Sequence, residues 1–460
     1  MTQSAFDVIV IGAGFAGLSA AVRATQGGAR VLVLEAKARL GGRATAFADR
    51  ETGELVDNGQ HILLGCYRDT FEFLAAVGAS DRVRLQSQLA VTMIDRAGRQ
   101  SRLSCPALPP PLHLAAGIFE WDALSWRDRL SLAGMATPLR LARRELTGSS
   151  SMKAASPGET VTAWLVRNGQ TPRLREMLWD PLALAALNQP PDEAAAPPFA
   201  RVLAEMFGSD PQAAAIALPT QPLHLFYAEP ARDWLVARGG SVMTGAAAKV
   251  RVEGDRIAAV EAQGQRWKPA AVVSSVPWFA FAELFDGVPA ALSDVAAGAD
   301  RMTSSPIVTV NLWFNRAVMD EPFVGLPGRA MQWVFDKRAT FGLGGPGGVN
   351  ASHLSLVSSG ATPIVRMAND ELITLAHQEL LDALPRVRDA NVQRATVVRE
   401  PRATFSLAPG QPARPGSQTN VRGFVIAGDW IDTGLPATIE SAVRSGHAAA
   451  TIATETNKIG

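Results

Sequence analysis

The chain has 460 residues, of which 47% are hydrophobic and 19% are charged, a globular composition with room for roughly two or three cooperating domains. Lysine and arginine number 44 against 43 acidic residues, so the formal charge of +1 provides no electrostatic footprint for nucleic acid, and no nucleic-acid partner is expected. The chain has two cysteines, Met1–Asp7 lacks the positive charge that begins a secretory signal, and no apolar run is long enough to span a bilayer. We therefore expect a cytoplasmic protein, either dissolved in the cytoplasm or peripheral on the inner face of the membrane.

The N-terminal stretch predicts a βαβ unit that binds a dinucleotide. A buried strand, a helix and a second strand are predicted at Phe6–Ile11, about Phe15–Gln26 and Ala29–Glu35. A Gly-x-Gly-x-x-Gly motif joins the first strand to the helix: Gly12 permits a tight turn, Gly14 lets the backbone approach a pyrophosphate, and Gly17 lets the helix pack close. Glu35 ends the second strand, where its carboxylate would accept hydrogen bonds from ribose hydroxyls. The predicted cofactor contacts in this unit are Gly12, Gly14, Phe15, Ala16, Gly17, Glu35 and Ala36.

Two adjacent glycines flanked by arginines follow, in the segment Arg39-Leu40-Gly41-Gly42-Arg43. They predict a loop that lies along the pyrophosphate, with Arg43 pairing with phosphate charge. A surface turn with solvated arginines is the alternative. A dehydrogenase that binds only NAD has no need of this second loop, whereas many flavoproteins have it. The predicted cofactor is therefore FAD, held in part by Gly41, Gly42 and Arg43.

A polar segment, Asp57-Asn58-Gly59-Gln60-His61, follows a predicted strand at Glu54–Val56. We expect Gly59, Gln60 and His61 to line the flavin ring. For His61, a role in proton transfer and a purely structural, hydrogen-bonded role carry equal weight on the sequence alone.

The middle of the chain predicts a long helical insertion followed by further strands. The pattern is mostly helical from Leu114 to about Phe207. Strands are predicted at Val91–Asp95, Val250–Glu253, Ile257–Glu261, Ala271–Ser274, Pro306–Phe314 and Leu354–Ser358, and a further helix at Met367–Ala383. Val250 joins the residues predicted to contact the cofactor.

The C-terminal part predicts another turn between a strand and a helix. An apolar strand at Val421–Ala427 runs into Gly428 and Asp429, and a helix is predicted from near Pro436 to Thr454, because proline suits a first helical turn. The N–H groups after Pro436 would face the electron-rich end of a flavin, and Asp429 would hold ribityl or pyrophosphate-bound groups. A merely structural βα unit is the alternative. The predicted cofactor contacts here are Gly428, Asp429, Pro436, Ala437, Thr438 and Ile439.

The order of these elements predicts an α/β fold: a Rossmann-like FAD-binding domain whose parallel sheet is assembled from distant segments, with an inserted, mixed α+β substrate domain. Residues 1–90, 235–285 and 400–460 are assigned to the first domain. Residues 91–234 and 286–399 are assigned to the second, which is partly helical and the candidate membrane-facing part. The sequence has no zinc-protease, P-loop or nucleophile-elbow motif, and no metal is expected.

With these motifs in order, the chain resembles the flavin amine oxidase and phytoene desaturase superfamily and, within it, the hydroxysqualene dehydroxylases of hopanoid biosynthesis. The resemblance covers nearly the whole chain, and its segments are Asp57–His61, Leu178–Leu182, Ala186–Asn188, Gln332–Asp336, Ala403–Phe405 and Ala427–Gly446. It implies an FAD-dependent oxidoreductase with a long apolar isoprenoid substrate, in which hydride from reduced FAD replaces the hydroxyl of hydroxysqualene to give squalene. The alternatives are a carotenoid (phytoene-type) desaturase, a flavin amine oxidase and a non-catalytic lipid escort protein.

Two further expectations concern the substrate. A proton must reach the leaving hydroxyl, and His61 and Asp180 are the candidate catalytic residues.

Peripheral contact with a membrane is one interpretation of Leu124–Leu146, where apolar residues mix with arginines. An ordinary amphipathic helix pair broken at Pro138 fits the same pattern equally well. The sequence does not identify the electron donor that reduces FAD.

Overall fold

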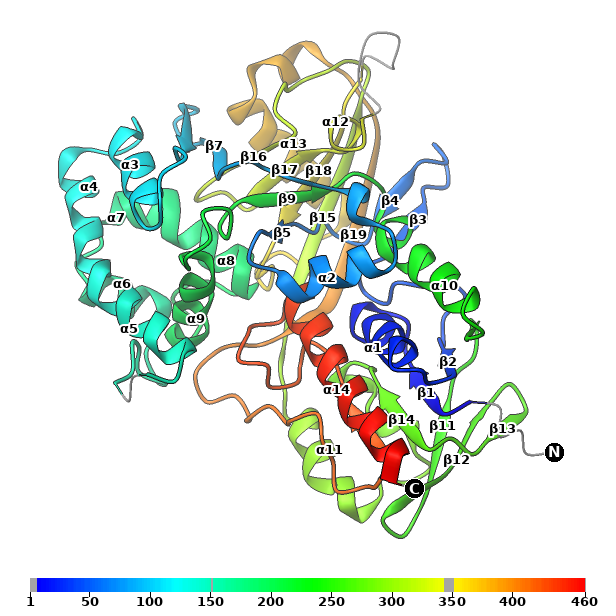
Figure 1. Ribbon diagram of the computed structural model, residues 1–460. Coiled ribbons are helices and arrows are strands. Elements are labelled where there is room, and N and C mark those ends of the chain that lie inside the picture. The colour runs from blue at the N-terminus through cyan, green and yellow to red at the C-terminus, as the bar shows by residue number, and fades with distance from the viewer. Residues whose placement is uncertain (1–5, 150–151, 343–350, 460) are drawn as a thin grey trace.

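The computed structural model describes residues 6–149, 152–342 and 351–459 (Figure 1). The first five residues, part of the Met1–Asp7 segment in which no secretory n-region is expected, lie outside the described residues.

A five-stranded parallel sheet organises one end of the molecule (Figure 1). Its strand order is β10 (Ser241–Met243), β2 (Val31–Leu34), β1 (Val8–Ile11), β14 (Ala271–Ser274) and β20 (Phe424–Ile426). Every neighbouring pair is parallel. The central strands are fully buried and rich in Val, Ile and Leu, as expected for strands covered on both faces. The predicted α/β fold, with a sheet assembled from distant segments, is confirmed.

Two helices from opposite ends of the sequence pack together beside this sheet. They are α1 (Phe15–Gln26) and α14 (Ile439–Ile459), which lie side by side in Figure 1. The start predicted for the last helix, near Pro436, is wrong. The hydroxyl of Thr438 accepts a hydrogen bond from the N–H of Ser441 (3.1 Å), so Thr438 caps the helix and the first helical residue is Ile439.

A larger, mostly antiparallel sheet of seven strands carries the second part of the fold. Its order is β19 (Val392–Phe405), β15 (Ser304–Phe314), β18 (His353–Ser358), β17 (Trp333–Asp336), β16 (Phe323–Gly325), β7 (Ala90–Ile94) and β8 (Gln100–Ser104). Helix α13 (Asn369–Ala383) packs on it. The sequence did not predict β19, because its charged residues hide any strand pattern. Its antiparallel pairing with β15 defines it.

Smaller elements connect these sheets. The antiparallel sheets comprise β3 (Ala46–Ala48) with β4 (Leu55–Asp57), β5 (Leu63–Leu64) with β9 (Ile216–Pro219) and β6 (Val83–Leu85), and β11 (Lys249–Glu253) with β12 (Arg256–Ala262) and β13 (Gln265–Trp267). The remaining helices here are α2 (Arg68–Ala76), α10 (Glu229–Val236), α11 (Ser293–Asp300) and α12 (Lys337–Thr340).

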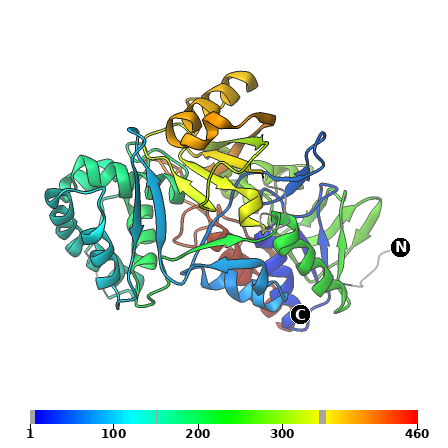
Figure 2. The ribbon, with the colours of Figure 1, turned by 90° about the horizontal axis from the view of Figure 1, so that it is seen from above.

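A bundle of short helices forms the end opposite the parallel sheet (Figure 2). Its helices are α3 (Leu112–Glu120), α4 (Trp126–Ser131), α5 (Ala136–Leu146), α6 (Val161–Arg167), α7 (Pro172–Leu174), α8 (Asp180–Leu187) and α9 (Ala196–Met206). Buried Trp164 and Trp179 anchor it, with the indole of Trp179 donating to Oε1 of Gln170 (2.9 Å). The expected break at Pro138 is wrong: the chain changes to a 3-10 turn before α5, and Pro138 lies in the first turn of that helix, where proline is tolerated. Among the described residues, no helix combines the length and apolar character needed to cross a bilayer.

Candidate cofactor and active site

A cavity of about 940 Å³ opens at the carboxyl ends of the parallel strands, where α/β sheets bind their ligands. Its walls include Ile11 at the end of β1, Leu34 at the end of β2, Ser275 after β14 and Gly428 after β20. The volume is at the upper end of the range for small-molecule sites, as a dinucleotide requires.

The first wall of this cavity is the turn into α1. Gly12 has a φ of +104°, a conformation that residues with a side chain rarely adopt. A Cβ at Gly17 would overlap the carbonyl oxygen of Gly12, so Gly17 lets α1 close on the turn and does not itself line the cavity. No side chain caps the start of α1, which leaves its first N–H groups free for phosphate oxygens.

The second glycine loop is bonded to the first. The N–H of Gly41 donates to the carbonyl of Ala13 (2.9 Å), and a Cβ on Gly42 would lie 3.3 Å from the Cα of Gly14. Because the two loops approach through bare backbone, their N–H groups can meet the same pyrophosphate. The two glycine loops thus form a cradle of bare backbone. Side chains at these glycines would fill its space, so the cradle fits the predicted dinucleotide.

Charged groups stand at defined points along the cavity. Glu35 accepts hydrogen bonds from the N–H groups of Ala13 (2.8 Å) and Lys37 (2.9 Å), which fix its carboxylate at the end of β2. Arg43 donates to Oδ1 of Asp429 (2.6 Å), so residues from the two ends of the chain form one ion pair on the cavity wall.

The segment with Gly59, Gln60 and His61 also lines the cavity. A buried ion pair supports it: Nζ of Lys337 contacts Oδ2 of Asp57 and Oε1 of Gln60, both at 2.6 Å. Nδ1 of His61 lies 3.1 Å from the carbonyl oxygen of Gly59. Burial lowers the pKa of His61, so the neutral ring is favoured.

The cavity brings together most of the residues predicted to hold the cofactor. All of them line it except Gly17, Val250 and Pro436. Val250 lies on β11 with its side chain in the core, and the preceding residues 246–249 line the cavity instead. Asp180 lines neither this cavity nor the one described below. Burial raises the pKa of Asp180, and its Oδ1 has no hydrogen-bond partner among the described residues.

Several lining residues were not predicted from the sequence. They include Tyr67, Ala185, residues 246–249 and 275–277, Glu400 and Arg402. Ser275 directly follows β14, and its hydroxyl donates to the carbonyl of Ile11 (2.9 Å), so its position after a parallel strand is the signal that could have identified it.

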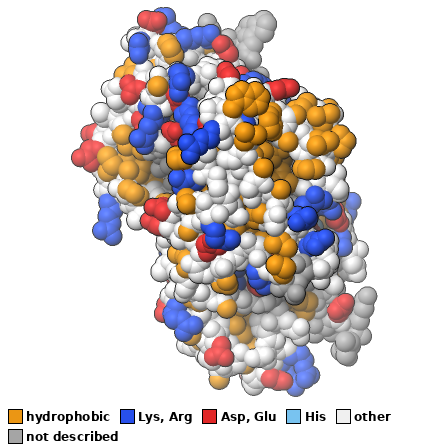
Figure 3. Space-filling model, turned by 90° about the vertical axis from the view of Figure 1, so that its left-hand side faces the viewer, with side chains coloured by type: hydrophobic (Ala, Val, Ile, Leu, Met, Phe, Trp, Pro, Cys, Tyr) orange, Lys and Arg blue, Asp and Glu red, His pale blue; other side chains and the backbone are white. Residues whose placement is uncertain are grey.

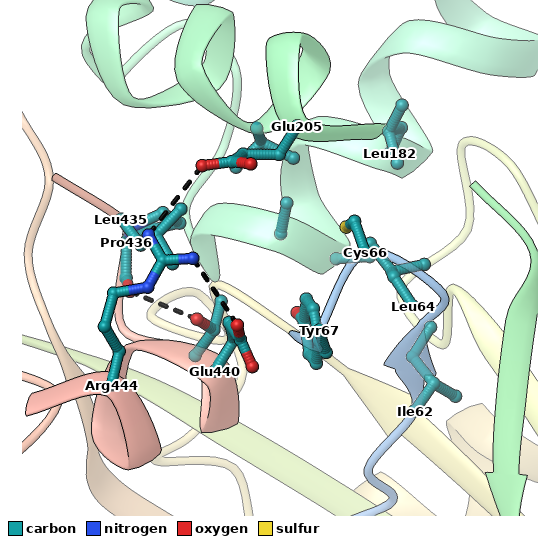
Figure 4. A pocket seen from close by; sticks show the side chains of 14 residues that line it. Ile62, Leu64, Cys66, Tyr67, Leu182, Glu205, Leu435, Pro436, Glu440 and Arg444 are labelled. Atoms are coloured by element: carbon teal, nitrogen blue, oxygen red, sulfur yellow. Dashed lines mark hydrogen bonds and ion pairs between the residues drawn. The ribbon is translucent and has the colours of Figure 1, made fainter. Parts of the chain in front are cut away.

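A second cavity adjoins the first, between α8, α9 and the start of α14 (Figure 4). Most of its lining is apolar, from Ile62, Leu64, Leu182, Ala185, Ala186, Val202, Leu435 and Pro436. The two cavities share the lining residues Ile62, Tyr67, Ala185, Ala186 and Thr438. Figure 4 shows Arg444 reaching between two carboxylates on one side, with Nη2 at 3.4 Å from Glu440 and Nη1 at 3.8 Å from Glu205. Burial raises the pKa of the Cys66 thiol to about 12, which leaves it an uncharged wall residue.

Comparison with known proteins identifies the family. Residues 15–453 match the family described as flavin containing amine oxidoreductase. The chain belongs to this family. It is 30% identical to hydroxysqualene dehydroxylase of Rhodopseudomonas palustris, over 96% of this chain and 97% of the relative. It is 24% identical to 15-cis-phytoene desaturase of Solanum lycopersicum, over 96% of this chain and 76% of the relative. The structure of cyclohexylamine oxidase from Brevibacterium oxydans IH-35A superposes with a TM-score of 0.72 at 17% identity, covering 98% of this chain and 99% of that one.

These matches confirm the predicted cofactor class and the resemblance to hydroxysqualene dehydroxylases. The chain is an FAD-dependent oxidoreductase. The paired glycine loops, the free start of α1 and Glu35 are the features of this structure that fit FAD.

Proposed function

We propose that this enzyme removes the hydroxyl group of hydroxysqualene reductively to give squalene. The observation that carries the proposal is an apolar cavity of about 90 Å³ that shares a wall with the cofactor-lined one, because a short apolar segment of an isoprenoid held there would place the neighbouring carbon toward the cofactor cavity. The full-length similarity to a hydroxysqualene dehydroxylase supports this substrate.

The residues that we assign to FAD follow from the geometry. Glu35 would accept from the ribose, the two glycine loops would hold the pyrophosphate, and residues 59–61 and 437–439 would line the ring. Arg43 and Asp429 would orient the groups between them. Residues 1–90, 235–285 and 400–460 would form the FAD-binding domain, and residues 91–234 and 286–399 the substrate domain.

The chemistry divides between the cofactor and the chain. When bound and reduced, FAD supplies hydride. The chain's apolar walls, such as Leu64 and Leu182, exclude water from the reacting carbon. The hydroxyl is allylic, so C–O cleavage leaves a delocalised cation, and a polar residue of the chain must supply a proton to the departing oxygen.

A product assay tests this proposal against its rival. FAD-loaded protein is reduced anaerobically and given hydroxysqualene, and the products are analysed for squalene by gas chromatography with mass detection. A parallel sample contains oxidised protein and phytoene. Squalene in the first sample supports the proposal. New conjugated double bonds in the second, with no squalene in the first, would replace it with the desaturase alternative, to which the similarity to phytoene desaturases points less strongly.

We also propose that the helical end contacts a membrane through only part of the segment Leu124–Leu146 that the sequence suggested. Of the apolar residues in that segment, Met135 is buried, Leu132 and Leu139 pack against the core, and Trp126 and Leu130 on α4 remain exposed, at 67% and 63%. Exposed apolar side chains also precede α4, at Leu108, Leu112 and Phe119, and the ring of Phe119 packs edge-on against that of Trp126. Figure 3 shows hydrophobic side chains gathered on this side of the molecule. Such a patch beside exposed arginines suits an anionic lipid surface.

Vesicle flotation tests the membrane proposal. Protein is mixed with vesicles of phosphatidylethanolamine and phosphatidylglycerol, and the floating fraction is measured. The double variant Trp126→Ser/Leu130→Ser should bind at least about tenfold more weakly, because two large apolar side chains no longer enter the bilayer. Val236→Ser, at a valine 55% exposed on α10, is the control and should float like the wild type. Equal flotation of all three proteins would refute the proposal.

A further inference from the structure

The wall between the two cavities contains few groups that can hydrogen-bond to a substrate. Of its five residues, Ile62, Ala185 and Ala186 are apolar. The side-chain hydroxyls of the wall belong to Tyr67 and Thr438. A substrate that extends from the apolar cavity into the cofactor-lined one meets these two groups at the shared wall.

Thr438 is held by its role as helix cap, and its hydroxyl also hydrogen-bonds the phenol of Tyr67. Its hydroxyl accepts from the N–H of Ser441 (3.1 Å) and donates to the carbonyl of Pro436 (3.4 Å). Tyr67 lies at the N-cap of α2, and Figure 4 shows it between Glu440 and the apolar residues Ile62 and Leu64. Burial raises the pKa of Tyr67, with Cys66 and Glu440 adding to the rise and a hydrogen bond with Thr438 opposing it. The phenol therefore keeps its proton at neutral pH.

The two proton donors expected from the sequence fit this role less well. In neutral His61, Nδ1 carries the hydrogen, because the carbonyl of Gly59 beside it can only accept. Nε2 is then an acceptor and has no proton to give. On α8, Leu182 and Ala185 face the cavities. At about 100° per residue, Asp180 points to roughly the opposite side of that helix.

Building on the proposed function, we propose that the Tyr67 phenol is the catalytic acid, which hydrogen-bonds the allylic hydroxyl of the substrate and protonates it as it leaves. The C–O bond breaks, the hydroxyl takes the phenol proton and departs as water, and a new C–H bond forms with hydride from reduced FAD. The substrate carbon is reduced by two electrons and FAD is oxidised. The second proton of reduced FAD restores the phenol, so atoms and charge balance.

A change of leaving group tests this assignment. Wild type and Tyr67→Phe, both loaded with FAD and reduced, are given hydroxysqualene or its acetate ester, which can leave as acetate without prior protonation. We expect Tyr67→Phe to lower kcat for the alcohol by about 100-fold, the scale of general acid catalysis. For the ester we expect a loss below about threefold. A merely structural role would lower both rates alike, and that result, or an unchanged rate on the alcohol, would overturn the assignment.

The rates of wild type and Tyr67→Phe on the two substrates distinguish failure of this assignment from failure of the proposed function. Absence of turnover of both substrates by the wild type refutes the proposed function and this assignment with it, whereas wild-type turnover with a leaving-group-independent effect of Tyr67→Phe refutes the assignment alone. Asp180→Asn and His61→Gln are measured in parallel, and a loss confined to the alcohol in either of them would also overturn it.

A second measurement covers the case in which Tyr67→Phe does not fold. Tyr67 and Tyr227 are the two tyrosines of the chain, so replacing tyrosine throughout by the more acidic 3-fluorotyrosine changes two sites. A stronger acid should raise the rate on the alcohol relative to the ester. An unchanged ratio would contradict the assignment.

Discussion

Tyr227→Phe removes one hydroxyl that holds the second glycine loop. Tyr227 is fully buried, and its phenol donates to the carbonyl of Gly41 (2.9 Å), with the carbonyl of Ala44 at 3.3 Å. Its ring stacks on Phe15, the first residue of α1, with centroids 3.5 Å apart. One side chain therefore connects both loops of the cofactor cradle, and phenylalanine would keep the stacking while losing the hydrogen bond.

The magnitude follows from the loss of one buried donor. Leaving a buried carbonyl without its partner costs about 1–3 kcal/mol. If the loop shifts in the variant and FAD binding must restore it, the same free energy is lost from binding, and the Kd for FAD rises by about 5- to 150-fold. The apoprotein is titrated with FAD while the quenching of flavin fluorescence is followed, and thermal unfolding is measured with and without FAD.

A matched control separates loop positioning from general stability. Ser352→Ala also removes a buried hydroxyl, one that donates to Asp336 (2.6 Å) beside the seven-stranded sheet. It should lower the unfolding midpoint and leave the FAD affinity unchanged. If Tyr227→Phe behaves in the same way as this control, the phenol does not position the cofactor loop, and the reasoning fails.

Three further predictions concern stability. Gly17→Ala should yield protein that lacks FAD or does not fold, because a Cβ there overlaps the carbonyl of Gly12. The flavin absorbance of the purified protein measures this, and a yellow, stable variant would contradict the close approach. Lys337→Met should lower the free energy of unfolding in urea by about 3–5 kcal/mol, since it leaves Asp57 buried and unpaired, and adding Asp57→Asn should recover part of the loss. His113 is buried without ring partners among the described residues, and burial lowers its pKa, so the unfolded state gains the proton first and stability falls as pH drops below about 6.5. His113→Leu should therefore reduce the fall in unfolding midpoint between pH 7 and pH 5, and an unchanged pH profile would contradict this.

Much of the cofactor cradle could be predicted because its signals are local. The turn at Gly12 and the acid at Glu35 each depend on a few consecutive residues, and the sequence placed both within a strand–turn–helix context that the structure confirms. One failed prediction was also local. The start of α14 depends on the cap by Thr438 three residues before Ser441, which a general preference for proline in the first turn obscured.

The same contrast applies to the site. Nothing near Tyr67 or Tyr227 in the sequence indicates a cavity wall or an anchor for a glycine loop, because their neighbours in space come from other parts of the chain. Asp180 shows the converse: it is a candidate acid whose pKa is raised by burial, yet the side of α8 that faces the cavities carries Leu182 instead.

The sequence by itself determined the βαβ unit, the pair of glycine loops and thus the dinucleotide chemistry, since backbone sterics and hydrogen bonding act over a few residues. The tertiary structure alone decided which side chains share the wall between the two cavities, which residues of α3 and α4 remain exposed, and that Arg43 meets Asp429 across the whole length of the chain. Those outcomes depend on how apolar faces of distant elements pack, and packing is a property of the assembled fold.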